Sequence, residues 1–113
     1  MTKIYHNPRC SKSRETLQIL EEKGEKLEII KYLETVPSKE ELLEIIQLLG
    51  ITPLDLVRKN ETIWKEEFKG KKMSDAKIIA AMMKHPKLME RPIVIKNGRA
   101  IIGRPPQAVN KIL

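Results

Sequence analysis

The stretch KIYHNPRCSKSRETLQILEEKGEKLEIIKY, residues 3–32, decides the fold of this 113-residue chain. Residues 3–5 are predicted to form a short strand, and a helical period follows over residues 11–23 until Gly24 ends it. Residues 27–32 partly alternate and indicate a second strand. Strand, helix and strand within about thirty residues predict a βαβ unit with parallel pairing.

The middle of the chain is predicted to be helical. Ser38 with Glu41 forms a capping box, and Thr52 and Ser74 mark the starts of two further helices. Residues 61–68 are predicted to add another helical turn or two. The period of the helix after Ser74 predicts a buried face made of Ile78, Ile79, Met82 and Met83.

The end of the chain returns to strands. Residues 92–95 and 100–102 flank Asn97-Gly98, which is a strong signal for a type I′ hairpin, and a last helix is predicted up to residue 113. The order is therefore β-α-β, a helical block, and β-β-α. We interpret this as an α/β chain with a thioredoxin-like fold, one domain over 1–113 with a helical insertion at about 37–86.

The amino-acid composition argues against several classes of function. The formal charge is +7, but the lysines alternate with glutamates, which is typical of a solvated surface, and four aromatic residues offer little for base stacking. No apolar run approaches the ~20 residues of a membrane span. Two histidines and one cysteine have no metal-ligand spacing. We therefore expect a cytoplasmic monomer that binds no metal, no membrane and no nucleic acid directly.

The single cysteine, Cys10, stands at the start of the first predicted helix. Arg9, Lys12 and Arg14 flank it, and a thiol at a helix N-terminus beside cations becomes a thiolate near neutral pH. Free backbone N–H groups and the helix dipole also attract an anion there. The alternative is a small buried side chain without chemistry. The charged neighbours favour the reactive interpretation.

Five segments of the chain together carry a family resemblance. In order along the chain they are residues 4–14, 32–35, 56–60, 85–94 and 103–105. In these segments the chain resembles the glutaredoxin-dependent arsenate reductase family, a thioredoxin-like group that includes the Spx-type regulators. The resemblance implies an oxidoreductase that reduces arsenate to arsenite, with no bound cofactor and with glutathione as co-substrate.

The resemblance also implies roles for individual residues. Cys10 matches the nucleophile that attacks arsenic. The anion-binding positions are Arg58, Arg91 and Arg104. A guanidinium presents a planar fork suited to oxyanions and stays charged, which agrees with that role. By residue type alone, each of the three is a surface ion-pair residue.

Three further positions match supporting residues of the family. His6 corresponds to a histidine that helps keep the cysteine ionised, and Ser13 to a serine whose hydroxyl supports the thiolate. Pro92 matches a proline that is typically preceded by a cis peptide bond. By residue type alone, His6 also suits a strand-end turn and Ser13 a helix cap.

One cysteine cannot complete a dithiol cycle, so the second thiol must come from outside. The family mechanism takes it from glutathione, and glutaredoxin resolves the resulting disulfide. Ser13 stands where Spx-type regulators carry a second cysteine, which argues against an internal redox switch. Arg9 departs from the family pattern. Two alternatives stay open: another glutathione-dependent thiol reductase on this scaffold, and a non-enzymatic, Spx-like module that binds RNA polymerase.

Overall fold

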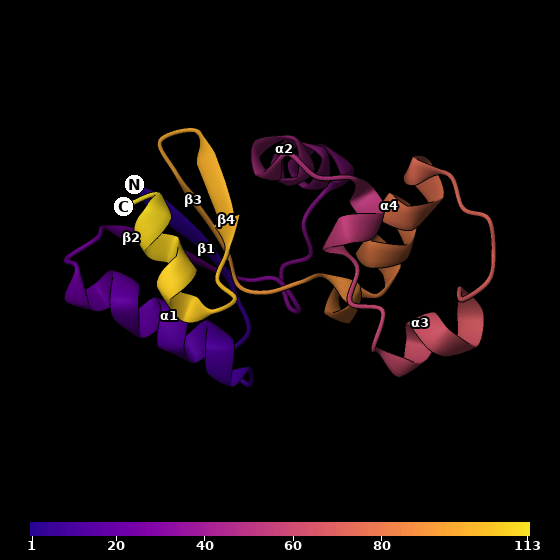
Figure 1. Ribbon diagram of the computed structural model, residues 1–113, viewed down its shortest axis with the longest axis horizontal. Helices are drawn as coiled ribbons and strands as arrows, with labels where there is room; N and C mark the ends of the chain where they lie inside the picture. The colour runs from indigo at the N-terminus through magenta and orange to yellow at the C-terminus, as the bar shows by residue number, and fades with distance from the viewer. The chain divides into compact units, whose positions relative to one another are not determined.

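The computed structural model describes residues 1–113, and the chain divides into two compact units (Figure 1). The first unit comprises Met1–Thr35 and Arg91–Leu113, and the second unit comprises Val36–Glu90. The helical insertion predicted at about 37–86 falls within the second unit, and that it is an insertion stays a prediction. That the whole chain acts as a single domain stays a prediction, and each unit is described by itself.

The first unit is an α/β layer with thioredoxin-like topology. Its elements are β1 (Thr2–His6), α1 (Ser11–Glu22), β2 (Leu27–Lys31), β3 (Ile93–Lys96), β4 (Arg99–Ile102) and the 3₁₀ helix η3 (Pro106–Lys111). The strand order is β2-β1-β3-β4. β1 and β2 are parallel, while β3 runs antiparallel to both β1 and β4. The predicted βαβ unit and the predicted hairpin of two antiparallel strands near the C-terminal end are both confirmed.

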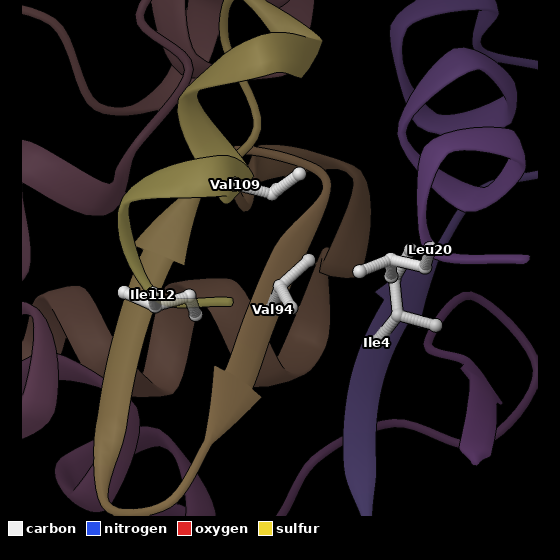
Figure 2. Close-up of a cluster of buried hydrophobic side chains, with 5 residues drawn as sticks. All are labelled: Ile4, Leu20, Val94, Val109 and Ile112. Atoms are coloured by element: carbon white, nitrogen blue, oxygen red, sulfur yellow. The ribbon is translucent and has the colours of Figure 1, made fainter. Parts of the chain in front are cut away.

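A compact apolar cluster holds the first unit together (Figure 2). Its members are Ile4 of β1, Leu20 of α1, Val94 of β3, and Val109 and Ile112 at the C-terminal end. Ile4 and Val94 are register partners across the sheet, so α1 and η3 cover the same face. Full burial of such a side chain contributes about 1.5–3 kcal/mol. This cluster therefore fixes α1 on the sheet.

Two details at the C-terminal end test the sequence predictions. Asn97 and Gly98 both have positive φ, 50° and 71°, as the predicted type I′ turn requires. The predicted last helix is a 3₁₀ helix instead of an α-helix. Ala108 donates to the Pro105 carbonyl, an i→i+3 bond, and a segment this short closes with such tighter bonds.

The second unit is helical. It contains α2 (Lys39–Leu49), η1 (Pro53–Leu56), α3 (Thr62–Glu67), α4 (Asp75–Lys84) and η2 (Pro86–Leu88). The Ser38–Glu41 capping box is confirmed, and the Ser74 hydroxyl accepts a hydrogen bond from the backbone N–H of Lys77. The helix after Thr52 is a single 3₁₀ turn. None of the chain's helices has the length and apolar character needed to cross a membrane.

The helix α4 shows the limit of periodicity. Ile78, Ile79 and Met82 are buried as predicted, with exposures of 4%, 3% and 0%. Met83 is 37% exposed, so its predicted burial is wrong. The apolar stripe of a helix is wide enough to contain this residue, but the packing partners decide which edge of the stripe is covered.

Candidate functional site

A tight turn carries the chain from β1 into α1 and places Cys10 at the helix start. The Cys10 N–H donates to the Asn7 carbonyl at 3.0 Å, and the Asn7 Oδ1 accepts from the Arg9 N–H at 3.0 Å. Arg14 reaches back from α1 and donates to the Pro8 carbonyl at 2.9 Å. Cys10 therefore occupies the N-cap of α1 in an extended conformation. The Asn7-Pro8 pair is a turn signal in the sequence, but it does not predict the role of Asn7 in this turn.

The environment of Cys10 favours the thiolate. Burial by itself raises the pKa of the thiol, since its residue is only 9% exposed. Three partners outweigh burial and bring the pKa below its usual value: the Ser13 backbone N–H, the Arg91 guanidinium and the Lys12 backbone N–H. The two N–H groups are orphan donors of the first helical turn, so a thiolate caps the helix as an anion would. The reactive interpretation of Cys10 is the one this geometry supports.

Two of the three predicted arginines lie with Cys10 in the first unit. Arg91 hydrogen-bonds to the sulfur and acts on it through its charge. Arg104 places Nη2 at 3.8 Å from Sγ, and its Nε donates to the Arg91 carbonyl at 3.0 Å. The Arg91–Pro92 peptide bond is cis, which agrees with the expectation for Pro92, and the Arg104–Pro105 bond is cis as well. Two guanidiniums therefore converge on one sulfur.

Gly103 supports the site, although no pattern in the sequence predicts a role for it. A Cβ at this residue would lie 2.6 Å from Thr16 Oγ1 and 2.8 Å from Pro92 Cγ, much closer than side-chain carbons approach. The Gly103 N–H also donates to the Pro92 carbonyl at 2.9 Å. The absence of a side chain here lets the segment that carries Arg104 pass between α1 and the start of β3. Only tertiary contacts reveal this requirement.

His6 and Ser13 contact each other. The Ser13 Oγ lies 2.6 Å from His6 Nδ1 and accepts a hydrogen bond from the Asn7 N–H at 3.0 Å. Burial, followed by the charges of Lys31 and Arg14, lowers the pKa of His6. His6 is therefore neutral at pH 7 and holds the Ser13 end of the turn. Ser13 favours the thiolate through its backbone N–H.

Arg58, the third predicted arginine, belongs to the second unit. Its Nη1 lies 3.0 Å from Glu61 Oε1, and its Nε lies 3.3 Å from Glu90 Oε1. Backbone hydrogen bonds hold Arg58 beside Glu90. The Arg58 N–H donates to the Leu88 carbonyl, and the Glu90 N–H donates to the Leu56 carbonyl. Its convergence on Cys10 stays a prediction. No group of three or more His, Cys, Asp or Glu side chains is arranged to hold a metal ion.

Comparisons with known proteins agree on one family. Residues 5–112 match the ArsC family model. The chain is 48% identical to the uncharacterised protein YfgD of Escherichia coli, covering 98% of this chain and 95% of that protein. It is 41% identical to an arsenate reductase of Neisseria meningitidis, with coverage of 98% and 97%. The solved arsenate reductase of Vibrio cholerae is 52% identical, with a TM-score of 0.95 over 99% of this chain and 97% of that one.

Proposed function

The chain belongs to the ArsC family, and on that premise we propose that it reduces arsenate to arsenite through the thiolate of Cys10. One observation carries the proposal. The only cysteine stands at a helix N-terminus with two guanidiniums directed at its sulfur. This set of groups supplies a nucleophile and a fixed positive field to a tetrahedral oxyanion at the same place.

The first chemical step is attack of the Cys10 sulfur on arsenic. A sulfur–arsenic bond forms and an arsenate oxygen leaves as hydroxide, which is protonated to water. Arg91 and Arg104 stabilise the negative charge that the remaining oxygens carry in this step. Because arginine stays protonated, this field is the same before and after the displacement.

The second step needs a thiol from outside, because the chain has one cysteine. Glutathione displaces a further hydroxide from the arsenic and forms a second sulfur–arsenic bond. The two sulfurs then join, two electrons pass to arsenic, and arsenic leaves in the trivalent state. The Cys10–glutathione disulfide that remains is reduced by glutaredoxin, which regenerates the thiolate.

The experiment that tests the proposal is arsenate-dependent NADPH oxidation, coupled through glutathione, glutaredoxin and glutathione reductase. We expect turnover with the native chain and none with Cys10→Ser. Omission of glutathione or of glutaredoxin should each abolish turnover as well. Turnover that persists in Cys10→Ser, or in the absence of any external thiol, would contradict the mechanism.

A second candidate function is reduction of a glutathione mixed disulfide without arsenate. The ion pairs of Arg58 with Glu61 and Glu90 favour it, because a neutralised guanidinium adds less field for an oxyanion. Hydroxyethyl disulfide with glutathione is the test substrate. Turnover of this substrate together with no response to arsenate would move the assignment to the second candidate.

A further inference from the structure

A cavity of about 280 Å³ opens beside the catalytic turn, within the first unit. Loop residues 6–9 form one wall, and Lys31, Leu33 and Glu34 form the other. Its walls belong to the end of β1 and to the turn after β2, which are parallel neighbours in the sheet. Arg91 and Arg104, the guanidiniums directed at sulfur, take no part in it.

The cavity carries charges of both signs that do not neutralise one another. Arg9, Lys31 and Glu34 are exposed, and none of them makes an ion pair or a side-chain hydrogen bond with the protein. Lys31 and Glu34 are joined only through the backbone, where the Glu34 N–H donates to the Lys31 carbonyl at 3.0 Å. Two free cations and one free carboxylate around one cavity match a ligand with a carboxylate and an ammonium group.

The cavity also offers an apolar surface and lies near the nucleophile. Leu33 is 42% exposed, and Pro8 lies on the opposite wall, so methylene groups of a ligand have a place to pack. Asn7 lines the cavity and Cys10 closes the same hydrogen-bonded turn, whose ends lie within about 7 Å of each other. An extended tripeptide spans at most about 10 Å, so one ligand can reach from the cavity to the sulfur.

We propose that this cavity binds the α-amino-acid end of the donor thiol, a γ-glutamyl peptide such as glutathione. The ligand's α-carboxylate lies between Lys31 and Arg9, and its α-ammonium group pairs with Glu34. This assignment rests on the proposed function, because that function requires an external thiol. It separates two binding tasks: Arg91 and Arg104 hold the oxyanion, while Lys31 and Glu34 select the thiol. The cavity takes no part in bond making or breaking.

Binding is measured without turnover, on the Cys10→Ser chain with S-methylglutathione, whose sulfur cannot react. Backbone amide resonances followed by NMR during the titration report both the affinity and the position of the ligand. We expect the largest shifts at residues 6–9 and 31–34. S-methylglutathione acetylated on its α-amino group should bind about two- to fivefold more weakly, since it cannot pair with Glu34.

Matched variants identify the residues responsible. Lys31→Met and Glu34→Gln should each weaken binding about two- to fivefold, the range for exposed ion pairs. Lys26→Met and Glu28→Gln are the controls, because both residues are exposed on the same chain segment and neither lines the cavity. The controls should leave the affinity unchanged. A change with the controls as large as with the cavity variants would point to net charge alone and overturn the site.

Three other results would overturn the proposal. One is equal affinity for the acetylated and unmodified ligands. Another is a set of shifts centred on Arg91, Ile93 and Gly103 instead of the cavity. The third is free glutamate binding as tightly as S-methylglutathione, which would make the cavity a site for free amino acids. If the chain binds S-methylglutathione in the cavity as expected but does not turn over arsenate, the proposed function is contradicted and the proposed binding site is still supported.

Discussion

The two units of this chain use arginine in opposite ways. In the first unit, Arg91 and Arg104 direct their charge at the Cys10 sulfur, and burial and the helix N-terminus concentrate that field. In the second unit, Arg58 meets the carboxylates of Glu61 and Glu90. The same residue type thus lies against a thiol in one unit and joins a carboxylate cluster in the other. A sequence motif identifies the arginine, but the side chains around that arginine determine which group its charge acts on.

The largest effect that separates the units is expected on turnover. Arg104→Ala should lower kcat/KM for arsenate about 10²–10³-fold, the loss typical for one preorganised donor to an oxyanion. Arg58→Ala should cost less, about tenfold, because carboxylates already neutralise this guanidinium. Arg99→Ala is the control, an exposed arginine on β4. Equal losses of kcat/KM in Arg58→Ala and Arg104→Ala would contradict the difference between the two units and would indicate that all three arginines contribute to anion binding.

The next effect is on stability. Gly103→Ala should lower the free energy of unfolding by about 2–3 kcal/mol, because its Cβ meets Thr16 and Pro92. Gly70→Ala in the second unit should cost about 1 kcal/mol, since its φ of +80° is strained for alanine but the space is open. Urea unfolding measures both.

The matched double variant refines the stability test. Thr16→Ala removes the Oγ1 and Cγ2 atoms that Gly103→Ala would meet and leaves Pro92 Cγ, so the double variant should lose less than the sum of the single changes. Arsenate turnover should fall in Gly103→Ala and hold in Gly70→Ala, because only the first change moves Arg104. Strict additivity in the double-mutant cycle would rule out the contact as the cause.

A smaller effect concerns the pKa of Cys10. Arg91→Ala removes a hydrogen bond and a positive charge that both lower this pKa. The pH midpoint of alkylation by iodoacetamide should therefore move to higher pH, and less thiolate should be present at pH 7. Arg58→Ala should leave the midpoint nearly unchanged. An unchanged pH midpoint of alkylation in Arg91→Ala would mean that the backbone N–H groups of the helix alone lower the pKa of Cys10.

The smallest effect is the pH dependence contributed by His6. Its pKa is lowered in the folded state, so the unfolded chain binds the proton more readily. His6 therefore contributes stability above its unfolded pKa of about 6.5, and this contribution is lost as pH falls through the lower folded pKa. The Tm should drop more between pH 7 and pH 5 in the native chain than in His6→Gln. An identical drop in both would remove His6 as the cause.

Much of the fold could be predicted because local chemistry and tertiary packing agree. The Ser38–Glu41 box, the Asn97-Gly98 turn and the strand–helix–strand pattern each have a local cause, and the structure confirms all three. Predictions failed where packing decides: Met83 is exposed, and the last helix is a 3₁₀ helix. Periodicity measures which side chains are apolar, whereas exposure depends on partners distant in the sequence.

For the candidate site, the sequence by itself determined the candidate nucleophile and the charged residues beside it. Cys10 is the one thiol, and Ser11 onward is helical, so a thiolate at a helix N-terminus follows from local chemistry. Tertiary structure alone decided which groups reach the sulfur. It brought Arg91 and Arg104 to Cys10 across some eighty to ninety-four positions of sequence, made Gly103 indispensable to that approach, and turned His6 toward Ser13. The physical reason is that pKa and anion affinity depend on distances between side chains, which only the folded chain sets.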